Sequence, residues 1–388
     1  MPYARRSRAV LALATMAVAF VWAAPRVSAS GDDEVRVFSG VQLVNDVSRR
    51  PILGLSPVTD GTVIDLGRLT HHRLSLQATV APGAHLAGVA FTLSGASGSS
   101  LTRTESRAPY FLCGDYVDCP LLATPDDYSL TAQALSATGT PTGRALTVRF
   151  TVASASSAAT AAPPLDVLFV GNSLIGTTTE ATGEDTPDVL SHLAAIEGRP
   201  VNVTKVIHFG YTLRHTWSDG LAASALDGRK QYDFIVLQEL SILVVTNLPA
   251  ATDTLLNLYA PTFRRALKPG GRVVLFKNWV LKNPSPFRSR AAAKTALDAN
   301  YAALSAALAT PNLLAPIGDE FETVISAKGA SHLIVPDGKH PTEVAVYLDA
   351  VTLFGILFAA SPRDLPSLYL PADTAAYLRS VAATAIGY

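Results

Sequence analysis

The stretch that decides the fold is LDVLFVGNS, residues 165–173. Its apolar run, Val167-Leu168-Phe169-Val170, ends abruptly at Gly171-Asn172-Ser173. Such an uninterrupted apolar run is typical of a strand buried on both faces of a parallel sheet. Open α/β sheets bind their ligands at the carboxyl ends of these strands. The stretch therefore predicts a buried strand that carries the hydroxyl of Ser173 to that edge.

Downstream of this stretch, strand-like and helix-like segments alternate. Strands are predicted at 165–170, 201–207, 233–238, 272–277 and 312–317, and helices near 186–198, 252–267, 289–308 and 342–359. Such alternation predicts an α/β domain in which helices cover a parallel sheet.

Upstream, residues 35–153 show apolar residues at every second position, punctuated by Gly, Pro, Ser and Asp. This pattern predicts an all-β sandwich domain. Residues 154–164 are small and end in two prolines, which is typical of a linker between domains.

The N-terminus has the features of an export signal. Three arginines among residues 5–8 precede the apolar run 9–24, and small residues at 27–29 suit cleavage before Ser30. We expect a secreted protein without a stable membrane segment, with an uncleaved anchor as the alternative. Cleavage removes four arginines and no acidic residue, so the net charge falls from 0 to about −4. That balance argues against a nucleic-acid partner.

The only two cysteines are Cys113 and Cys119. In an exported protein this close pair predicts a small disulfide loop, and two free thiols are the alternative. A zinc site needs more ligands than this pair has nearby. We expect neither a metal nor a cofactor.

A second short segment bears on chemistry: Asp337-Gly338-Lys339-His340-Pro341. Its histidine can serve as a general base near neutral pH, and Asp337 can orient the imidazole toward a nucleophile such as Ser173. The alternative is structural. Gly-Asn-Ser suits a plain turn, and Asp-Gly suits a turn before a helix that begins with Pro341.

In this order and at this separation, the Gly-Asn-Ser and Asp-x-x-His segments resemble the SGNH/GDSL hydrolase superfamily, mostly esterases and acyl hydrolases. The resemblance covers roughly residues 165–362 and leaves 363–388 as a C-terminal extension. It implies a three-layer, flavodoxin-like domain. It also implies that Ser173, Asp337 and His340 form the catalytic set.

The resemblance further implies an oxyanion hole made by the backbone N–H of Ser173, a glycine after the second strand and a polar side chain after the third. Gly210 fits the glycine position. At the third strand, the sequence departs from the usual Gly-x-Asn-Asp and has Gln238-Glu239-Leu240-Ser241. We expect Gln238 to donate its amide, with Ser241 as the alternative donor and Glu239 as a structural acid.

These features predict a monomeric secreted serine esterase that removes O-acyl, chiefly acetyl, groups from a carbohydrate. The sugar is suggested by Ser106–Asp115, which resembles a segment of the immunoglobulin-like sandwiches of secreted bacterial carbohydrate-active proteins. The competing hypothesis is an inactive extracellular carbohydrate-binding or adhesion protein. A nucleotide-dependent enzyme is disfavoured, because the residues after the first strand lack the glycine spacing of a phosphate loop. No Gly-x-Ser-x-Gly elbow of an α/β-hydrolase is present either.

Overall fold

The computed structural model describes residues 36–388, except 48, 70–72, 116, 155–162 and 241. The predicted export signal and most of the predicted linker lie outside the described residues. No helix in the described part of the chain is both long enough and apolar enough to cross a bilayer.

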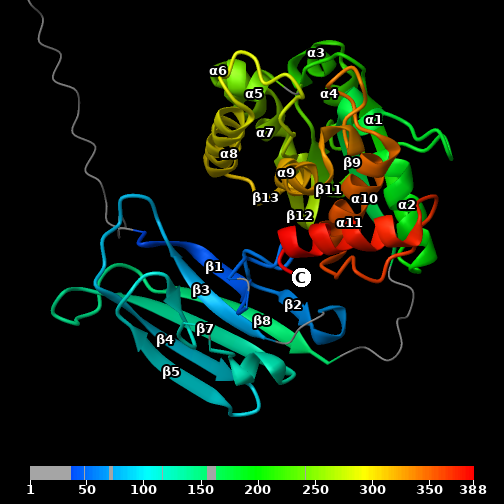
Figure 1. Cartoon of the computed structure of the whole chain (residues 1–388). Coiled ribbons are helices and arrows are strands. Elements are labelled where there is room, and N and C mark those ends of the chain that lie inside the picture. Colours follow the sequence, from blue (N-terminus) through cyan, green and yellow to red (C-terminus); the bar gives the residue numbers. More distant parts are fainter. Residues whose placement is uncertain (1–35, 48, 70–72, 116, 155–162, 241) are drawn as a thin grey trace, which may run out of the picture. The chain divides into compact units, whose positions relative to one another are not determined.

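The N-terminal part contains two β-sheets (Figure 1). One has the order β1-β3-β6 and the other β2-β8-β7-β4-β5. Their strands are β1 Phe38–Asn45, β2 Thr62–Asp65, β3 Leu74–Val80, β4 Gly88–Gly95, β5 Ser100–Glu105, β6 Tyr110–Phe111, β7 Asp126–Leu135 and β8 Leu146–Ala153. Neighbouring strands are antiparallel except β2 and β8. The alternate apolar side chains are buried, as in Phe91 and Leu93 of β4.

Two short 3₁₀ helices, η1 Leu66–Arg68 and η2 Pro120–Ala123, lie in the connections of this part. Cys113 and Cys119 form a disulfide with a Cα–Cα distance of 5.4 Å. The predicted pairing is therefore confirmed. The backbone N–H of Cys119 also donates to the carbonyl of Leu74, which fastens the disulfide loop to β3.

The C-terminal part is built on a five-stranded parallel sheet. Its strands are β9 Leu165–Gly171, β10 Val201–Ile207, β11 Tyr232–Leu237, β12 Leu267–Phe276 and β13 Asn312–Ala315. Their spatial order, β10-β9-β11-β12-β13, is the doubly wound order found in flavodoxin. Residues 167–170 of β9 are completely buried, as the continuous apolar run predicts. The sheet edge formed by the carboxyl ends of β9, β10 and β11 receives the candidate site.

Helices cover both faces of this sheet (Figure 1). Successive residues of β9 enter two separate cores. Val167 and Phe169 belong to the apolar cluster that includes residues of α2, α9, α10 and α11, whereas Leu168 and Val170 belong to the cluster that includes residues of α7 and α8. The helices are α1 Ser173–Gly176, α2 Thr186–Ile196, α3 Leu213–Ser218, α4 Leu221–Ala225, α5 Leu243–Thr246, α6 Leu248–Asp253, the π-helical turn η3 Thr254–Tyr259, α7 Ala260–Ala266, α8 Arg290–Ala307, α9 Ile317–Lys328, the 3₁₀ turn η4 Ala330–His332, α10 Glu343–Phe358 and α11 Ala372–Ala385.

Several elements differ from the sequence-based expectations. The helix predicted near 252–267 is interrupted by the π-helical turn η3. The strand predicted at 312–317 ends at Ala315, because Pro316 caps α9, a helix that the apolar pattern did not predict. Residues 363–388, expected as an extension, contain α11, whose Leu378 is completely buried. This helix contacts both α9 and α10.

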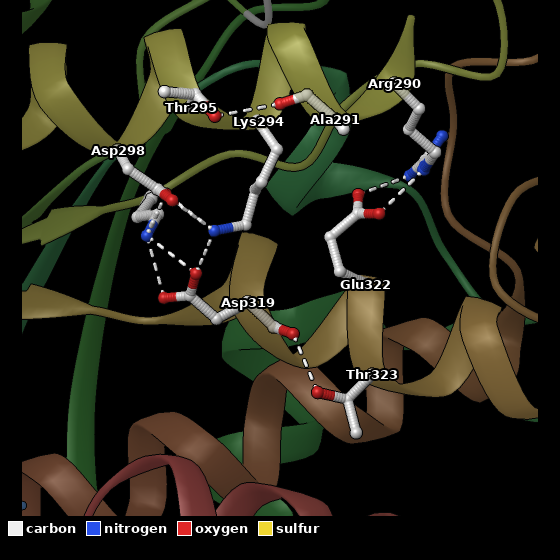
Figure 2. Close-up of polar contacts among 9 residues, drawn as sticks. Arg290, Ala291, Lys294, Thr295, Asp298, Asp319, Glu322 and Thr323 are labelled. Carbon is white, nitrogen blue, oxygen red and sulfur yellow. Dashed lines mark hydrogen bonds and ion pairs between the residues drawn. The ribbon is translucent and has the colours of Figure 1, made fainter.

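An ion cluster joins the end of β12 to α8 and α9 (Figure 2). The side chain of Lys277 is only 7% exposed and lies 2.6 Å from Asp298 and 2.7 Å from Asp319. Lys294 of α8 bridges the same two carboxylates. Because two lysines balance two aspartates, the buried charge of Lys277 is compensated. The cluster fixes the first residue of the segment 277–282, which reaches the candidate site.

Candidate active site

Ser173 is placed by the way β9 ends. Asn172 caps α1, with its side-chain Oδ1 accepting the N–H of Leu174 at 3.2 Å, and Ser173 is the first residue of that helix. A Cβ at Gly171 would lie 2.8 Å from Ile175 and 2.9 Å from Gln238. Glycine is thus needed for the close approach at this turn. Ser173 is 9% exposed and stands at the carboxyl edge of the sheet.

The structure brings Asp337, His340 and Ser173 together. Asp337 Oδ2 lies 2.5 Å from His340 Nδ1, and His340 Nε2 lies 2.8 Å from Ser173 Oγ. The second carboxylate oxygen of Asp337 accepts the backbone N–H groups of Lys339 at 2.8 Å and His340 at 3.1 Å. The three predicted residues therefore form one continuous chain of hydrogen bonds. With Nδ1–H donated to the carboxylate, Nε2 is free to accept the serine proton.

The electrostatics of Asp337 suit the orienting role. Desolvation opposes ionisation of its carboxyl group, but hydrogen bonds from the His340 ring and from the backbone N–H groups of Lys339 and His340 outweigh it. Together they lower the pKa of Asp337 to about 2. The residue is therefore an anion at neutral pH, which stabilises an imidazolium at His340.

The segment after β12 holds the loop that carries His340. The indole Nε1 of Trp279 donates to the carbonyl of Lys339 at 3.1 Å, and the N–H of Lys282 donates to the carbonyl of Gly338 at 2.9 Å. The Trp279 ring is buried and stacks on Phe321 of α9 at 4.1 Å between ring centroids. No motif around Trp279 in the sequence indicates its bond to Lys339, which is 60 residues away in the chain.

Gly210 lies in the loop that follows β10. This loop is tied to the Ser173 turn by two bonds: Asn172 Nδ2 donates to the carbonyl of Tyr211 at 3.0 Å, and the N–H of His208 donates to the carbonyl of Gly171 at 3.0 Å. Gly210 has φ +78°, a conformation that favours glycine, and a side chain there would meet nothing within 4 Å. Among the described residues, no acceptor engages the backbone N–H of Gly210 or of Ser173.

The structure engages the amide of Gln238, the predicted oxyanion donor, in contacts with other protein groups. Its side chain is completely buried, and its Nε2 donates to the carbonyl of Glu239 and, at 3.2 Å, to Oδ1 of Asn278. Both amide protons are thus engaged by protein oxygens. Its Oε1 accepts the backbone N–H of Asn172 at 2.9 Å, so the side chain supports the turn from beneath. The alternative donor, Ser241, lies outside the described residues.

Glu239 is a buried carboxyl group with two backbone partners. It accepts the N–H of Leu213 at 3.0 Å and the N–H of Leu240 at 2.6 Å. Burial raises the pKa of Glu239 to about 7, although these hydrogen bonds and the charge of Arg214 oppose the shift. Glu239 fixes the first turn of α3 and takes no part in the Ser173 chain, in line with the structural alternative.

No family model matches the chain, and no curated protein matches it. Solved structures do match about half of it. A candidate SGNH hydrolase from Slackia heliotrinireducens is 22% identical over 50% of this chain and 99% of its own, with a TM-score of 0.40. A DUF4886 family protein from Bacteroides uniformis is 17% identical over 58% and 95%, with a TM-score of 0.46. The lipase/acylhydrolase from Enterococcus faecalis is 13% identical over 52% and 99%, with a TM-score of 0.39. Likeness of this degree assigns no activity to this chain.

Proposed function

We propose that the protein is a secreted serine hydrolase that cleaves carboxylic esters through an acyl-serine intermediate. The observation that carries the proposal is the hydrogen-bond chain from Asp337 through His340 to Ser173. A nucleophile, a base and an ionised orienting acid in contact are the parts that such a reaction needs.

Acylation begins when Ser173 Oγ attacks the ester carbonyl while His340 Nε2 takes the hydroxyl proton. Asp337 stabilises the imidazolium. The tetrahedral intermediate collapses as its bond to the alcohol oxygen breaks, and His340 returns the proton to that alcohol. A water molecule then attacks the acyl-serine with the same base, which releases the carboxylic acid and restores Ser173.

The oxyanion of each tetrahedral intermediate needs donors that are not already engaged. The backbone N–H groups of Ser173 and Gly210 meet this condition among the described residues. The amide of Asn172 adds a third, because its Nδ2 carries two protons and gives one to Tyr211. In this arrangement Gln238 does not contact the oxyanion; it accepts the backbone N–H of Asn172 and so supports the turn that carries the donors.

For the substrate we propose an O-acyl ester, chiefly an acetyl ester, of an extracellular carbohydrate. Support comes from the export signal in the sequence, from a disulfide that suits an oxidising compartment, and from the Gln-Glu pair at 238–239, which resembles branches of the superfamily that include carbohydrate esterases. We expect a monomer.

A fluorophosphonate probe tests the reaction class directly, because it labels only an activated serine. Wild type should be labelled, Ser173→Ala should not, and Ser218→Ala should be labelled like wild type. Ser218 is a suitable control because its hydroxyl is exposed and, among the described residues, bonds only the carbonyl of Arg214. Acetate release from acetylated polysaccharides, set beside hydrolysis of 4-nitrophenyl acetate, then tests the substrate class. Labelling that persists in Ser173→Ala would contradict the assignment of the nucleophile.

The competing proposal is an inactive extracellular binding protein on the same folds. One observation favours it: the side chain at the third oxyanion position, Gln238, is turned away and fully engaged. This alternative would be established by a wild-type protein that the probe does not label and that releases no acetate, but whose migration in affinity electrophoresis is slowed by a polysaccharide in the gel.

A further inference from the structure

We propose that the rings of His208, Tyr211 and His215 form a binding site for a sugar ring on the alcohol side of the scissile ester. We call these three rings the aromatic shelf. The inference rests on the proposed function for the reaction, but the binding site itself is argued from the geometry of the shelf.

The three rings form a continuous stack. The centroids of His208 and Tyr211 are 5.2 Å apart with an angle of 28° between the ring planes, and those of Tyr211 and His215 are 4.9 Å apart at 38°. His208 follows β10, whereas His215 lies on α3. The stack therefore spans the whole loop between these two elements.

The shelf lies next to the nucleophile. The backbone of Tyr211 accepts the side chain of Asn172, and that of His208 donates to Gly171, so the shelf residues are bonded to the two positions before Ser173. Gly210, the candidate oxyanion donor, lies between His208 and Tyr211 in the chain. An ester carbonyl held at Gly210 and Ser173 would thus have one of its two substituents over this loop.

The shelf keeps its polar atoms available. Among the described residues, no hydrogen-bond partner engages the imidazole nitrogens of His208 and His215 or the hydroxyl of Tyr211. The contact between Trp217 of α3 and Tyr259 of η3 is different: the ring planes are inclined at 57°, Tyr259 is completely buried, and its hydroxyl donates to the carbonyl of Leu213. A buried ring with a bonded hydroxyl is typical of a packed core contact. The polar atoms of the shelf have no such bonds among the described residues.

A sugar ring is complementary to the shelf in both its apolar faces and its polar edges. Its C–H faces pack on aromatic rings, and its hydroxyl groups need donors and acceptors at the ring edges, which imidazole and phenol groups provide. Phe209, the next residue in the chain after His208, is 63% exposed, an unusual degree for a phenylalanine. A purely apolar acyl chain would leave the three polar tips unused.

The binding test uses Ser173→Ala, so that the ligand stays intact. Isothermal titration with acetylated xylotetraose should show binding, which Tyr211→Ala in the same background should weaken about 10-fold through the loss of ring stacking. Tyr211→Phe should retain most of the binding affinity because the aromatic ring remains. His215→Ala provides a second variant on an exposed position of α3 in case Tyr211→Ala does not fold. His192→Ala on α2, an imidazole paired with Glu184 and outside the shelf, should leave binding unchanged.

The kinetic test compares two substrates. On acetylated xylotetraose, Tyr211→Ala and His215→Ala should each lower kcat/KM about 10-fold relative to wild type, mainly through KM. On ethyl acetate, whose alcohol is too small to reach the shelf, both variants should match wild type.

The outcomes separate this inference from the proposed function. Equal losses on both substrates, or no detectable oligosaccharide binding by Ser173→Ala, would overturn the shelf even if the hydrolase stands. Oligosaccharide binding that depends on Tyr211 in a protein that hydrolyses no ester would overturn the hydrolase and leave the shelf in place.

Discussion

His340 Nε2 lies 2.8 Å from Ser173 Oγ, although 167 residues separate them along the chain. The contact has two independent supports. Beneath Ser173, Gln238 holds the N–H of Asn172; beside His340, Trp279 holds the carbonyl of Lys339. Each support is buried, so a change at either one should move a reacting group without touching substrate.

Asp337→Asn should lower kcat by about 10³- to 10⁴-fold, because an amide in place of the carboxylate favours the wrong imidazole tautomer and removes the charge that stabilises the imidazolium. Since the pKa of Asp337 is about 2, the loss should persist at every pH above about 4. Initial rates on 4-nitrophenyl acetate between pH 4 and 9 measure it. Asp219→Asn, an exposed aspartate at the end of α3, is the control. A variant within 10-fold of wild type would remove Asp337 from the mechanism.

Gln238→Ala should destabilise the fold and reduce kcat together. The change leaves the buried N–H of Asn172 without an acceptor and the buried Oδ1 of Asn278 without a donor, at a cost of about 1–3 kcal/mol for each unsatisfied group. Gln238→Glu should be worse, since a carboxylate oxygen would then face the oxygens of Asn278 and Glu239. Urea unfolding and steady-state kinetics of the same preparations measure both effects. A 10²-fold loss of kcat with unchanged stability and KM would instead restore Gln238 as a direct oxyanion donor.

The parallel sheet could be predicted from the sequence because its signal is local. A strand buried on both faces needs a continuous apolar run, as in residues 167–170 of β9. The bounds of β9, β10 and β11 lie within one or two residues of the predicted ones. Ser173 and His340 were found for the same reason: each lies in a short motif whose residues are neighbours in the chain.

The role of Gln238 could not be predicted, because it depends on partners far away in the chain. The direction of its amide is set by Asn172 and Asn278, which are 66 and 40 residues distant. Asn278 in turn belongs to the segment anchored by Lys277, whose carboxylate partners come from α8 and α9. Nothing in the sequence around Gln238 reports these contacts. The same holds for α11, whose apolar face is too short to identify without the α9 and α10 surfaces that it covers.

The stability of the protein should fall as pH rises from about 4.5 to about 7, in part because of Glu239. Burial raises its folded-state pKa to about 7, so the folded protein holds a proton that the unfolded chain releases in this window. The contribution of Glu239 to the free energy of unfolding is fully present below about pH 4.5 and should amount to about 3 kcal/mol. Urea midpoints of wild type and Glu239→Gln at pH 5 and pH 7.5 measure it.

Glu320 and Asp349 are also fully buried with raised pKa values, so they act in the same direction. The comparison with Glu239→Gln is therefore the decisive one, because the variant keeps an acceptor for Leu213 but cannot ionise. The variant should lose less stability than wild type over this interval. Equal losses would show that Glu239 titrates normally in the folded protein.

Trp279→Phe should reduce kcat by about 3- to 10-fold with little change in KM, because it deletes the 3.1 Å bond from the indole to Lys339 while an aromatic ring still faces Phe321. Trp279 is a positioning residue: it acts on the loop that carries His340 and not on substrate. Phe321→Leu is the matched control, since it disturbs the same stacked pair but keeps the indole N–H. Both variants should lower the urea midpoint, and only Trp279→Phe should lower kcat. If the two variants lose the same kcat, the packing of the pair and not the indole bond positions His340.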